Sequence, residues 1–529
     1  MDIVFNGALV VDGTGATGRR ADVGVHDGRI ADIGPRLSGR RTVDADGLVL
    51  APGFIDMHSH SDLQLLAAPE HLAKVSQGVT TEVLGQDGLS YAPVDDAVLA
   101  ALRAQLAGWN DDPAGFDWDW RSVGDYLDRL DRGIAVNAAY LVPQGTLRML
   151  CVGWEDRPAT PSELDRMREV LAASLHEGAV GLSSGLTYTP GMYAPHAELV
   201  ELCRVTGRLG GFYSPHHRSY GAGALEAYAE MVEVSRSSGC PLHLAHATMN
   251  FEVNRGRAGE LLTLLDDAIE AGADISLDTY PYLPGATYLS ALLPSWASEG
   301  GPEATLARLS DVDTRELIRR EIEETGSDGC HGVPVDWATI EINGVRRAEN
   351  SHLVGHSVAA SARAAGRPPA DLYFEVLTSE RLGTSCLMHV GHEENVRLIM
   401  KHPAHTGGSD GLLVGDRPHP RAWGTFPRYL ARYVRELGVL GLEECVAHLT
   451  GRAARRLRLP DRGLVRTGYA ADLVLFDPDT VADTATFEQP RQAATGIPYV
   501  LVNGVPVIDD GRRTDALPGH SLRNPGRPA

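Results

Sequence analysis

Two histidines that are one residue apart are the first candidates for chemistry. His58 and His60 follow the run 52–56 (PGFID), whose apolar residues predict a short strand. Side chains at positions i and i+2 of a strand point to the same face, so both imidazoles can reach one metal ion. A chain with 20 histidines also produces such pairs by chance, so the position at a strand end carries the argument.

Three further side chains have the same placement. His216 ends the run GGFYSPH, His246 ends PLHLAH, and Asp410 lies in TGGSDG. Zinc binds histidine nitrogen and carboxylate oxygen, and it activates a water molecule at an open position. Any one of these residues is equally typical of a hydrogen-bonded side chain near a loop. Together they predict a hydrolytic metal site in which Asp410 carries the proton from the water to the leaving nitrogen.

The elements that would position these residues lie in the segment 52–458. Apolar strand-like runs alternate there with amphipathic helices such as 161–178 and 259–272. The further strand candidates are GVTTEVLGQDG, GIAVNAAYLVPQG, GAVGLSSGL, GGFYSPHHR, PLHLAHAT, ADISLDTYPY, CLMHVGH and AHTGGSDG. This repeat predicts an α/β fold, a TIM-like (β/α)8 barrel, in which functional side chains collect at the carboxyl ends of the strands. Residues 285–350 interrupt the rhythm and predict an insertion over the barrel mouth.

The two ends of the chain have a different texture from the middle. Residues 1–51 and 459–529 contain short runs that alternate apolar and polar residues between Gly and Asp turns. We expect the two ends to pair into one small β-sandwich domain beside the barrel domain, 52–458. Two unrelated β-extensions are the alternative.

The composition restricts the partners and the compartment. With 48 Lys and Arg against 70 Asp and Glu, the net charge is −22, which argues against nucleic acid and against an anionic membrane surface. The sequence starts without a basic, apolar leader and has no run long enough to span a membrane. None of the six cysteines forms a CxxC pair, which argues against a disulfide scaffold. We therefore expect a cytoplasmic protein with a small-molecule partner, and the oligomeric state stays open.

The motifs together resemble the amidohydrolase superfamily, and within it the N-acyl-D-amino-acid deacylases, or D-aminoacylases. PGFIDMHSHSD is similar to the opening motif of the superfamily. GAVGLSSGLTYTPGMYA, GSDG and HPRAWGTFPRYLARYVRE resemble the D-aminoacylase branch, and the similarity spans nearly the whole chain. The resemblance implies a barrel with a β-sandwich built from both termini. It also implies a metal-dependent amide hydrolase that removes an acyl group from a D-amino acid with one or two zinc ions.

The resemblance also assigns roles by position. It places the weakly held metal on His58 and His60, the tighter metal on His216 and His246, and the catalytic carboxylate on Asp410. For the substrate, it implies that Arg421 holds a carboxylate and that Tyr188 and Tyr282 line the pocket. His217, His389 and His392 are expected to lie outside the metal site.

Two departures from the family pattern bear on these roles. Asp87 stands where the family has a cysteine ligand, and a carboxylate there favours a two-metal site or a metal other than zinc, such as manganese or iron. The alternative is that Asp87 only hydrogen-bonds a neighbour. Thr248 stands where a lysine usually pairs with the substrate carboxylate, and Ala286 replaces a serine. An unusual substrate is therefore expected.

Three functions remain open on this basis. The first is the deacylase just described. The second is an enzyme of the same superfamily that acts on a different amide, a cyclic amide or a secondary metabolite. The third is an inactive barrel that serves as a binding scaffold, and the retention of the histidines and Asp410 argues against it.

Overall fold

The computed structural model describes residues 1–524, and the predicted domain end at 525–529 lies outside the described residues. Its centre is a sheet of eight parallel strands that closes into a barrel, which confirms the predicted fold class. Backbone hydrogen bonds close the barrel between its first and last strands, from Met57 N to Gly407 O at 3.1 Å and from Asp410 N to His58 O at 2.8 Å. The barrel strands are β6 (Phe54–Asp56), β7 (Val79–Leu84), β8 (Asn137–Pro143), β9 (Gly181–Gly185), β10 (Phe212–His216), β11 (Leu242–Leu244), β12 (Ile275–Thr279) and β17 (His405–Gly407).

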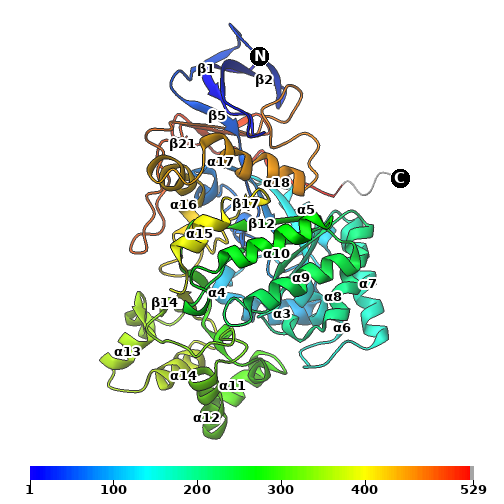
Figure 1. The fold of residues 1–529 in the computed structure, drawn as a ribbon, viewed down its shortest axis with the longest axis vertical. Helices are drawn as coiled ribbons and strands as arrows, with labels where there is room; N and C mark the ends of the chain where they lie inside the picture. Colours follow the sequence, from blue (N-terminus) through cyan, green and yellow to red (C-terminus); the bar gives the residue numbers. More distant parts are fainter. Residues whose placement is uncertain (525–529) are drawn as a thin grey trace.

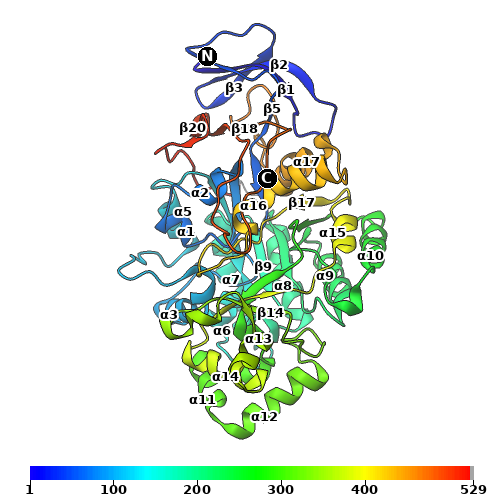
Figure 2. The ribbon, with the colours of Figure 1, turned by 90° about the vertical axis from the view of Figure 1, so that its left-hand side faces the viewer.

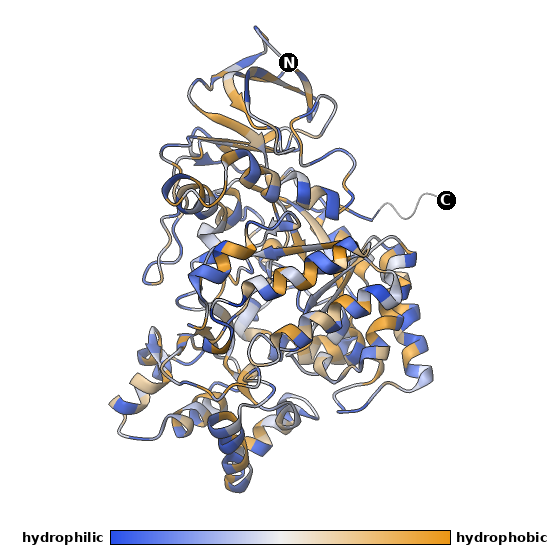
Figure 3. Ribbon diagram, in the orientation of Figure 1, coloured by the Kyte–Doolittle hydropathy of each residue, from blue (hydrophilic) through white to orange (hydrophobic). Residues whose placement is uncertain are grey.

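Helices cover the outside of the barrel (Figure 1). They alternate apolar and polar residues along their length (Figure 3), as amphipathic helices that bury one face do. The helix predicted at 161–178 spans 161–176. It begins with a capping box between Thr160 and Glu163, and Pro161 occupies its first position. The principal covering helices are α5 (Val123–Leu130), α7 (Pro161–His176), α8 (His196–Arg208), α9 (Ala224–Ser238), α10 (Ala258–Glu270), α15 (Glu393–Ile399), α16 (Arg421–Arg428), α17 (Leu442–Leu449) and α18 (Gly451–Arg456).

The two ends of the chain pair with each other. Nine strands from both ends form one mixed sheet around its own apolar core, and β5 joins β18 at its centre. This sheet lies at the end of the molecule marked by the N-terminus (Figures 1 and 2). Its strands are β1 (Ile3–Val10), β2 (Arg19–His26), β3 (Arg29–Gly34), β4 (Arg41–Asp44), β5 (Val49–Pro52), β18 (Leu473–Phe476), β19 (Tyr499–Val502), β20 (Val505–Asp509) and β21 (Arg512–Arg513). We propose that the two ends form one domain, divided from the barrel near 51 and 459.

The insertion is longer than predicted. Its four-stranded sheet and separate apolar core extend to Met388, beyond the expected limit of 350. The run 386–392 (CLMHVGH) was predicted as a barrel strand, and that prediction was wrong, because β16 pairs with β13 and β14 instead. The insertion contains β13 (Gly285–Tyr288), α11 (Pro302–Ser310), α12 (Val312–Arg320), β14 (Ile340–Gly344), β15 (His356–Ser357), α13 (Val358–Ala364), α14 (Pro369–Ser379) and β16 (Ser385–Met388).

The insertion helices α11–α14 lie at the opposite end of the molecule from the N-terminal strands in both views (Figures 1 and 2). This end is where the carboxyl ends of the barrel strands open, so the insertion covers the mouth as expected. Within the described residues, the structure contains no helix that is both long and apolar enough to cross a membrane.

Candidate metal centre and substrate pocket

Asp87 lies between two groups of histidines at the barrel mouth. Its Oδ1 is 3.5 Å from Nε2 of His58, and its Oδ2 is 3.5 Å from Nε2 of His60. The same Oδ2 is 3.4 Å from Nδ1 of His216 and 3.5 Å from Nε2 of His246. Both carboxylate oxygens therefore face imidazole nitrogens, which is an arrangement that a carboxylate bridging two metal ions needs.

The six predicted metal residues form two overlapping groups. In each group the candidate ligand atoms lie within 4.8 Å of one another, and Asp87 belongs to both. Asp410 joins the first group because its Oδ1 is 3.2 Å from Nε2 of His60. The first group is His58, His60, Asp87 and Asp410, and the second is Asp87, His216 and His246.

The polar atoms in this cluster fit a metal ion. Nε2 of His58 and Oδ1 of Asp87 face each other at 3.5 Å and are buried without a hydrogen-bond partner. Buried polar atoms without a partner are costly, and a bound cation would satisfy them. Imidazole nitrogens with carboxylate oxygens are a donor set that zinc accepts. The described residues of the mouth therefore offer a site for one ion or two.

The backbone at three of these positions is strained. Asp87, His246 and Asp410 have φ angles of 55°, 30° and 49°, in the left-handed region that non-glycine residues seldom occupy. Such strain persists only where the surroundings impose it, and it is concentrated at functional sites. Next to Asp87, a Cβ on Gly88 would lie 2.4 Å from the backbone nitrogen of Gly185, so this turn requires glycine.

Neighbouring side chains orient the histidines. Nε2 of His216 is 2.7 Å from Oγ1 of Thr187, and Nδ1 of His246 is 2.9 Å from the Tyr220 hydroxyl. The nitrogens that remain are the ones that face Asp87. Such partners hold a ligand ring in one tautomer and orientation.

Asp278 contacts two of the metal residues, His58 and His246, and the sequence did not single it out. Its Oδ2 is 3.6 Å from Nδ1 of His58, and its Oδ1 accepts a hydrogen bond from the backbone N–H of His246. The residue lies near the end of β12, so its strand-end position was the signal that could have identified it.

The electrostatic field keeps the two acids ionised. Burial alone would raise the pKa of Asp87, but the charges of His58, His246 and His216 outweigh it and hold the pKa well below its ordinary value. Burial also raises the pKa of Asp410, but the groups around it outweigh burial and lower the pKa below its ordinary value. Arg421 makes the largest of these lowering contributions. Both carboxylates are therefore available as acceptors.

Arg421 contacts the catalytic candidate from behind the pocket wall. Its Nη2 is 2.9 Å from Oδ2 of Asp410, and its guanidinium lies over the ring of Tyr280, a wall residue, at 4.4 Å. The side chain is completely buried, and it is absent from the described residues that line the pocket. Its Nε and Nη1 are buried without a hydrogen-bond partner, and a contact with a substrate carboxylate stays a prediction.

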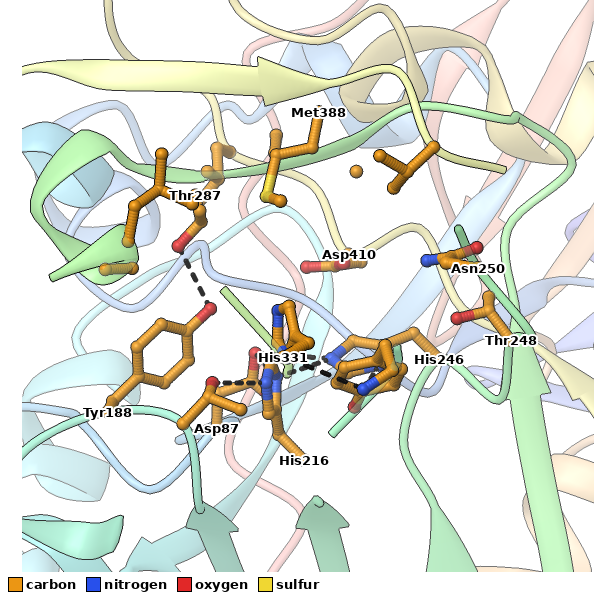
Figure 4. Close-up of a pocket in the computed structure, with 18 of the residues that line it drawn as sticks. Asp87, Tyr188, His216, His246, Thr248, Asn250, Thr287, His331, Met388 and Asp410 are labelled. Carbon is orange, nitrogen blue, oxygen red and sulfur yellow. Dashed lines mark hydrogen bonds and ion pairs between the residues drawn. The ribbon is translucent and has the colours of Figure 1, made fainter. Parts of the chain in front are cut away.

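The open space of the pocket above the metal residues, counted together with its mouth to solvent, is about 720 Å³. Tyr188 and Thr287 lie on one side of it, where their hydroxyls are 3.0 Å apart, and Thr248 lies on the other (Figure 4). Tyr188 and Thr248 both line this pocket, and their contact with a substrate stays a prediction. Tyr282 does not, because its ring packs between Arg428 and His419, and Tyr280 lines the pocket in its place.

The insertion supplies part of the wall. His331, Leu292 and Met388 come from it, and the barrel contributes Trp109 and Leu412. Burial lowers the pKa of His331 to about 3, with His216 and His246 adding to the effect, so this imidazole is neutral. None of the described residues in the wall is a lysine or an arginine. Among the described wall residues, the charged carboxylates are Asp87 and Asp410 at the metal residues, and the wall away from them carries no carboxylate, lysine or arginine.

Comparison with known proteins places this site in a family. The amidohydrolase family model matches residues 41–508, which is most of the chain. The chain belongs to the amidohydrolase family. This amidohydrolase is 36% identical to the D-aminoacylase of Alcaligenes xylosoxydans xylosoxydans, over 98% of the chain and 97% of that protein. It is also 36% identical to the N-acyl-D-glutamate deacylase of the same organism, over 100% of the chain and 96% of that protein.

A solved structure has the same fold. The crystal structure of the N-acyl-D-glutamate deacylase of Bordetella bronchiseptica, complexed with zinc and a phosphonate mimic of the tetrahedral intermediate, superposes with a TM-score of 0.84. Its sequence is 34% identical, and the match covers 99% of this amidohydrolase and 100% of that chain.

Three other histidines of this amidohydrolase lie outside the metal cluster, as expected. His217 is buried between the rings of Tyr220 and Tyr228. His389 pairs with Glu341 in the insertion, and His392 donates to a backbone carbonyl. The prediction that His217 lies outside the metal site followed from its position next to His216, because adjacent residues on a strand face opposite sides.

Proposed function

We propose that this metal-dependent amide hydrolase removes the acyl group from an N-acyl-D-amino acid whose side chain carries no charge. The observation that carries the proposal is a combination: two histidine groups share Asp87, and none of the described residues in the pocket wall is a lysine or an arginine. The relatives support the reaction class, since both act on N-acylated D-amino acids by name.

The metal residues are proposed to hold one or two zinc ions, with Asp87 between them. A bound divalent ion supplies Lewis acidity, which activates water and polarises the amide carbonyl. The protein fixes the donors for it, because Thr187 and Tyr220 orient two of the histidines. Asp278 holds the third from the far side.

Asp410 is proposed as the general base and then the general acid. Arg421 engages its Oδ2, which leaves Oδ1 on the side of His60 and the pocket. Oδ1 accepts the proton from the attacking water and returns it to the leaving nitrogen, so the amine departs neutral. Because Asp410 is ionised in the resting site, it is ready for the first transfer.

The wall favours an apolar substrate over an acidic one. Trp109, Phe251, Leu292, Met388 and Leu412 line the pocket, and no described cationic side chain joins them. An acidic side chain would enter such a wall without a partner, and an unpaired buried charge is strongly unfavourable. Equal identity to the D-aminoacylase and to the glutamate enzyme does not distinguish these substrates, so the proposal of an apolar substrate rests on the pocket wall.

The test is a substrate panel on the zinc-loaded enzyme. N-acetyl-D-leucine and N-acetyl-D-methionine are compared with N-acetyl-D-glutamate, N-acetyl-D-aspartate and the L-forms. We expect kcat/KM to be at least 100-fold higher for the apolar D-substrates than for the acidic ones. Preference for the acidic substrates would contradict the proposed wall, and no turnover of any D-substrate would contradict the proposed function.

A second candidate is the hydrolysis of an amide that lacks a free carboxylate, such as a cyclic amide. Thr248 offers no cation where the family has lysine, and Ala286 offers no hydroxyl where the family has serine. Arg421 is already engaged with Asp410. Hydantoins and lactams in the same panel separate the two. Turnover of these with none of the N-acyl series would select the second candidate.

A further inference from the structure

A second cavity adjoins the substrate pocket. Its open space, counted together with its mouth to solvent, is about 860 Å³, and it lies between the barrel and the insertion. The two cavities share four wall residues, so they meet along a common boundary. The shared residues are Phe251, Leu292, Met388 and Val390. We call this second cavity the side chamber.

The walls of the side chamber are mainly apolar. The insertion contributes Val333, Val335 and Ile340, and the loop after β11 contributes Val253. Val253 is 42% exposed, which indicates that the chamber reaches the surface on that side. Polar groups such as Glu252 and Asp336 also line it. Because both carboxylates are exposed, an apolar ligand would lie against the valines and leave these carboxylates to water.

Phe251 forms the boundary in a strained conformation. Its φ of 65° and ψ of 155° lie in a region that is used almost only by glycine. Two contacts hold it there: its N–H donates to the Val390 carbonyl at 2.7 Å, and its carbonyl accepts from Nε2 of His392 at 3.0 Å. The ring lies 5.6 Å from the ring of His331, the insertion residue that also lines the substrate pocket. Strain of this kind, placed between two cavities, points to a role for the boundary.

We propose that the side chamber holds an unbranched apolar tail of the amide substrate, several carbons long. The proposal rests on the proposed function and deepens it from an uncharged substrate to one with an extended apolar group. The reacting amide lies at the metal residues, and the tail passes Phe251 into the chamber. Each methylene that leaves water for an apolar wall strengthens binding, so the preference should grow with the length of the tail. The tail belongs either to the acyl group or to the amino-acid side chain.

The first experiment measures binding, so that it does not depend on turnover. Acetate, hexanoate and decanoate are titrated into the zinc-loaded enzyme by calorimetry. We expect the affinity to rise at least tenfold from acetate to decanoate. The substitutions Val335→Trp and Val253→Trp fill the chamber from the insertion and from the barrel side. Both should abolish the rise and leave acetate binding unchanged. Leu317→Trp is the matched control, because Leu317 is 55% exposed on α12 and outside the chamber walls.

The second experiment assigns the tail to one end of the substrate. N-acyl-D-alanines with two to ten acyl carbons are compared with N-acetyl derivatives of D-amino acids whose unbranched side groups increase in length. We expect kcat/KM to rise at least tenfold along one series and to stay flat in both tryptophan variants that fill the chamber. If short N-acetyl substrates are hydrolysed but neither series rises, the tail proposal is overturned and the proposed function stands. If nothing is hydrolysed, the proposed function fails, and the carboxylate titration alone tests whether the side chamber binds an apolar tail. Equal length dependence in wild type and both filled variants overturns the proposal.

Discussion

Arg421 holds Asp410 by one oxygen only, with Nη2 at 2.9 Å from Oδ2. The other oxygen, Oδ1, is thereby directed to His60 and the pocket. We expect Asp410→Asn to lower kcat about 10³-fold or more, because an amide cannot accept the proton from water. The remaining donors should keep metal in the protein. Metal analysis beside steady-state kinetics checks both, and near wild-type turnover would contradict the mechanism.

Arg421→Lys separates two roles for the guanidinium. If Arg421 acts through Asp410, as the contact indicates, the variant should lower kcat at least tenfold with KM within about threefold of wild type. A lysine keeps the charge but loses the planar contacts with Asp410 and Tyr280. If Arg421 instead holds the substrate carboxylate, KM would rise and kcat would change little. Kinetics with N-acetyl-D-leucine distinguish these results.

Asp87 should set the number of metal ions. Asp87→Asn leaves one acceptor oxygen in place of two and removes the charge, so we expect the metal content to fall by about one ion per protein molecule after dialysis. Asp87→Cys restores the ligand of the family pattern and should retain one tightly held ion. Elemental analysis of wild type and both variants measures this. Equal metal content in wild type and Asp87→Asn would show that Asp87 only hydrogen-bonds its neighbours.

The metal residues were predictable because their signals are local. An i, i+2 histidine pair, or an acid that follows a strand, needs only one segment to be recognised, and a barrel brings such segments together. The resemblance supplied Asp87, although this acid also follows a strand, since β7 ends at Leu84. One segment of sequence does not show which other strands a strand pairs with. The run 386–392 therefore looked like a barrel strand, because an apolar run has the same appearance in either sheet.

The pocket wall was harder to predict for a related reason. Tyr280 and Tyr282 lie just after β12, where Pro281 separates them and the strand alternation no longer applies. Alternation could not say which tyrosine faces the cavity. Arg421 was singled out for a substrate role, but its side chain contacts Asp410, which precedes it in the loop between β17 and α16. Contacts between side chains depend on packing that one sequence does not reveal.

Lys74 should contribute strongly to stability. Its ammonium is completely buried, with Nζ at 2.5 Å from Asp56 Oδ2, 3.1 Å from Glu82 Oε1 and 2.7 Å from Ser409 Oγ. The chain has only two lysines among its 48 basic residues, and Lys401 is exposed. We expect Lys74→Met to cost about 3–5 kcal/mol of unfolding free energy, because the buried Asp56 loses its cation and the buried Glu82 keeps only His71 as an ion-pair partner.

Lys401→Met is the matched control for this loss, and it should change stability by less than about 0.5 kcal/mol. Denaturant unfolding followed by circular dichroism measures both variants. Similar midpoints for Lys74→Met and Lys401→Met would contradict a structural role for the buried ammonium.

His405 should make the protein sensitive to acid. Burial lowers its pKa to about 3, with Arg452 adding to the effect and Asp278 opposing it. Below pH 6.5, the His405 imidazole therefore takes up a proton in the unfolded protein but stays neutral in the folded protein. Stability is lost as the pH falls from 6.5 towards 3. This one group should cost about 2 kcal/mol between pH 6.5 and 5. His405→Gln should flatten the pH dependence of the urea midpoint over that range, whereas His352→Gln, at an exposed position, should leave it unchanged. Equal slopes for wild type and His405→Gln would exclude His405 as the titrating group.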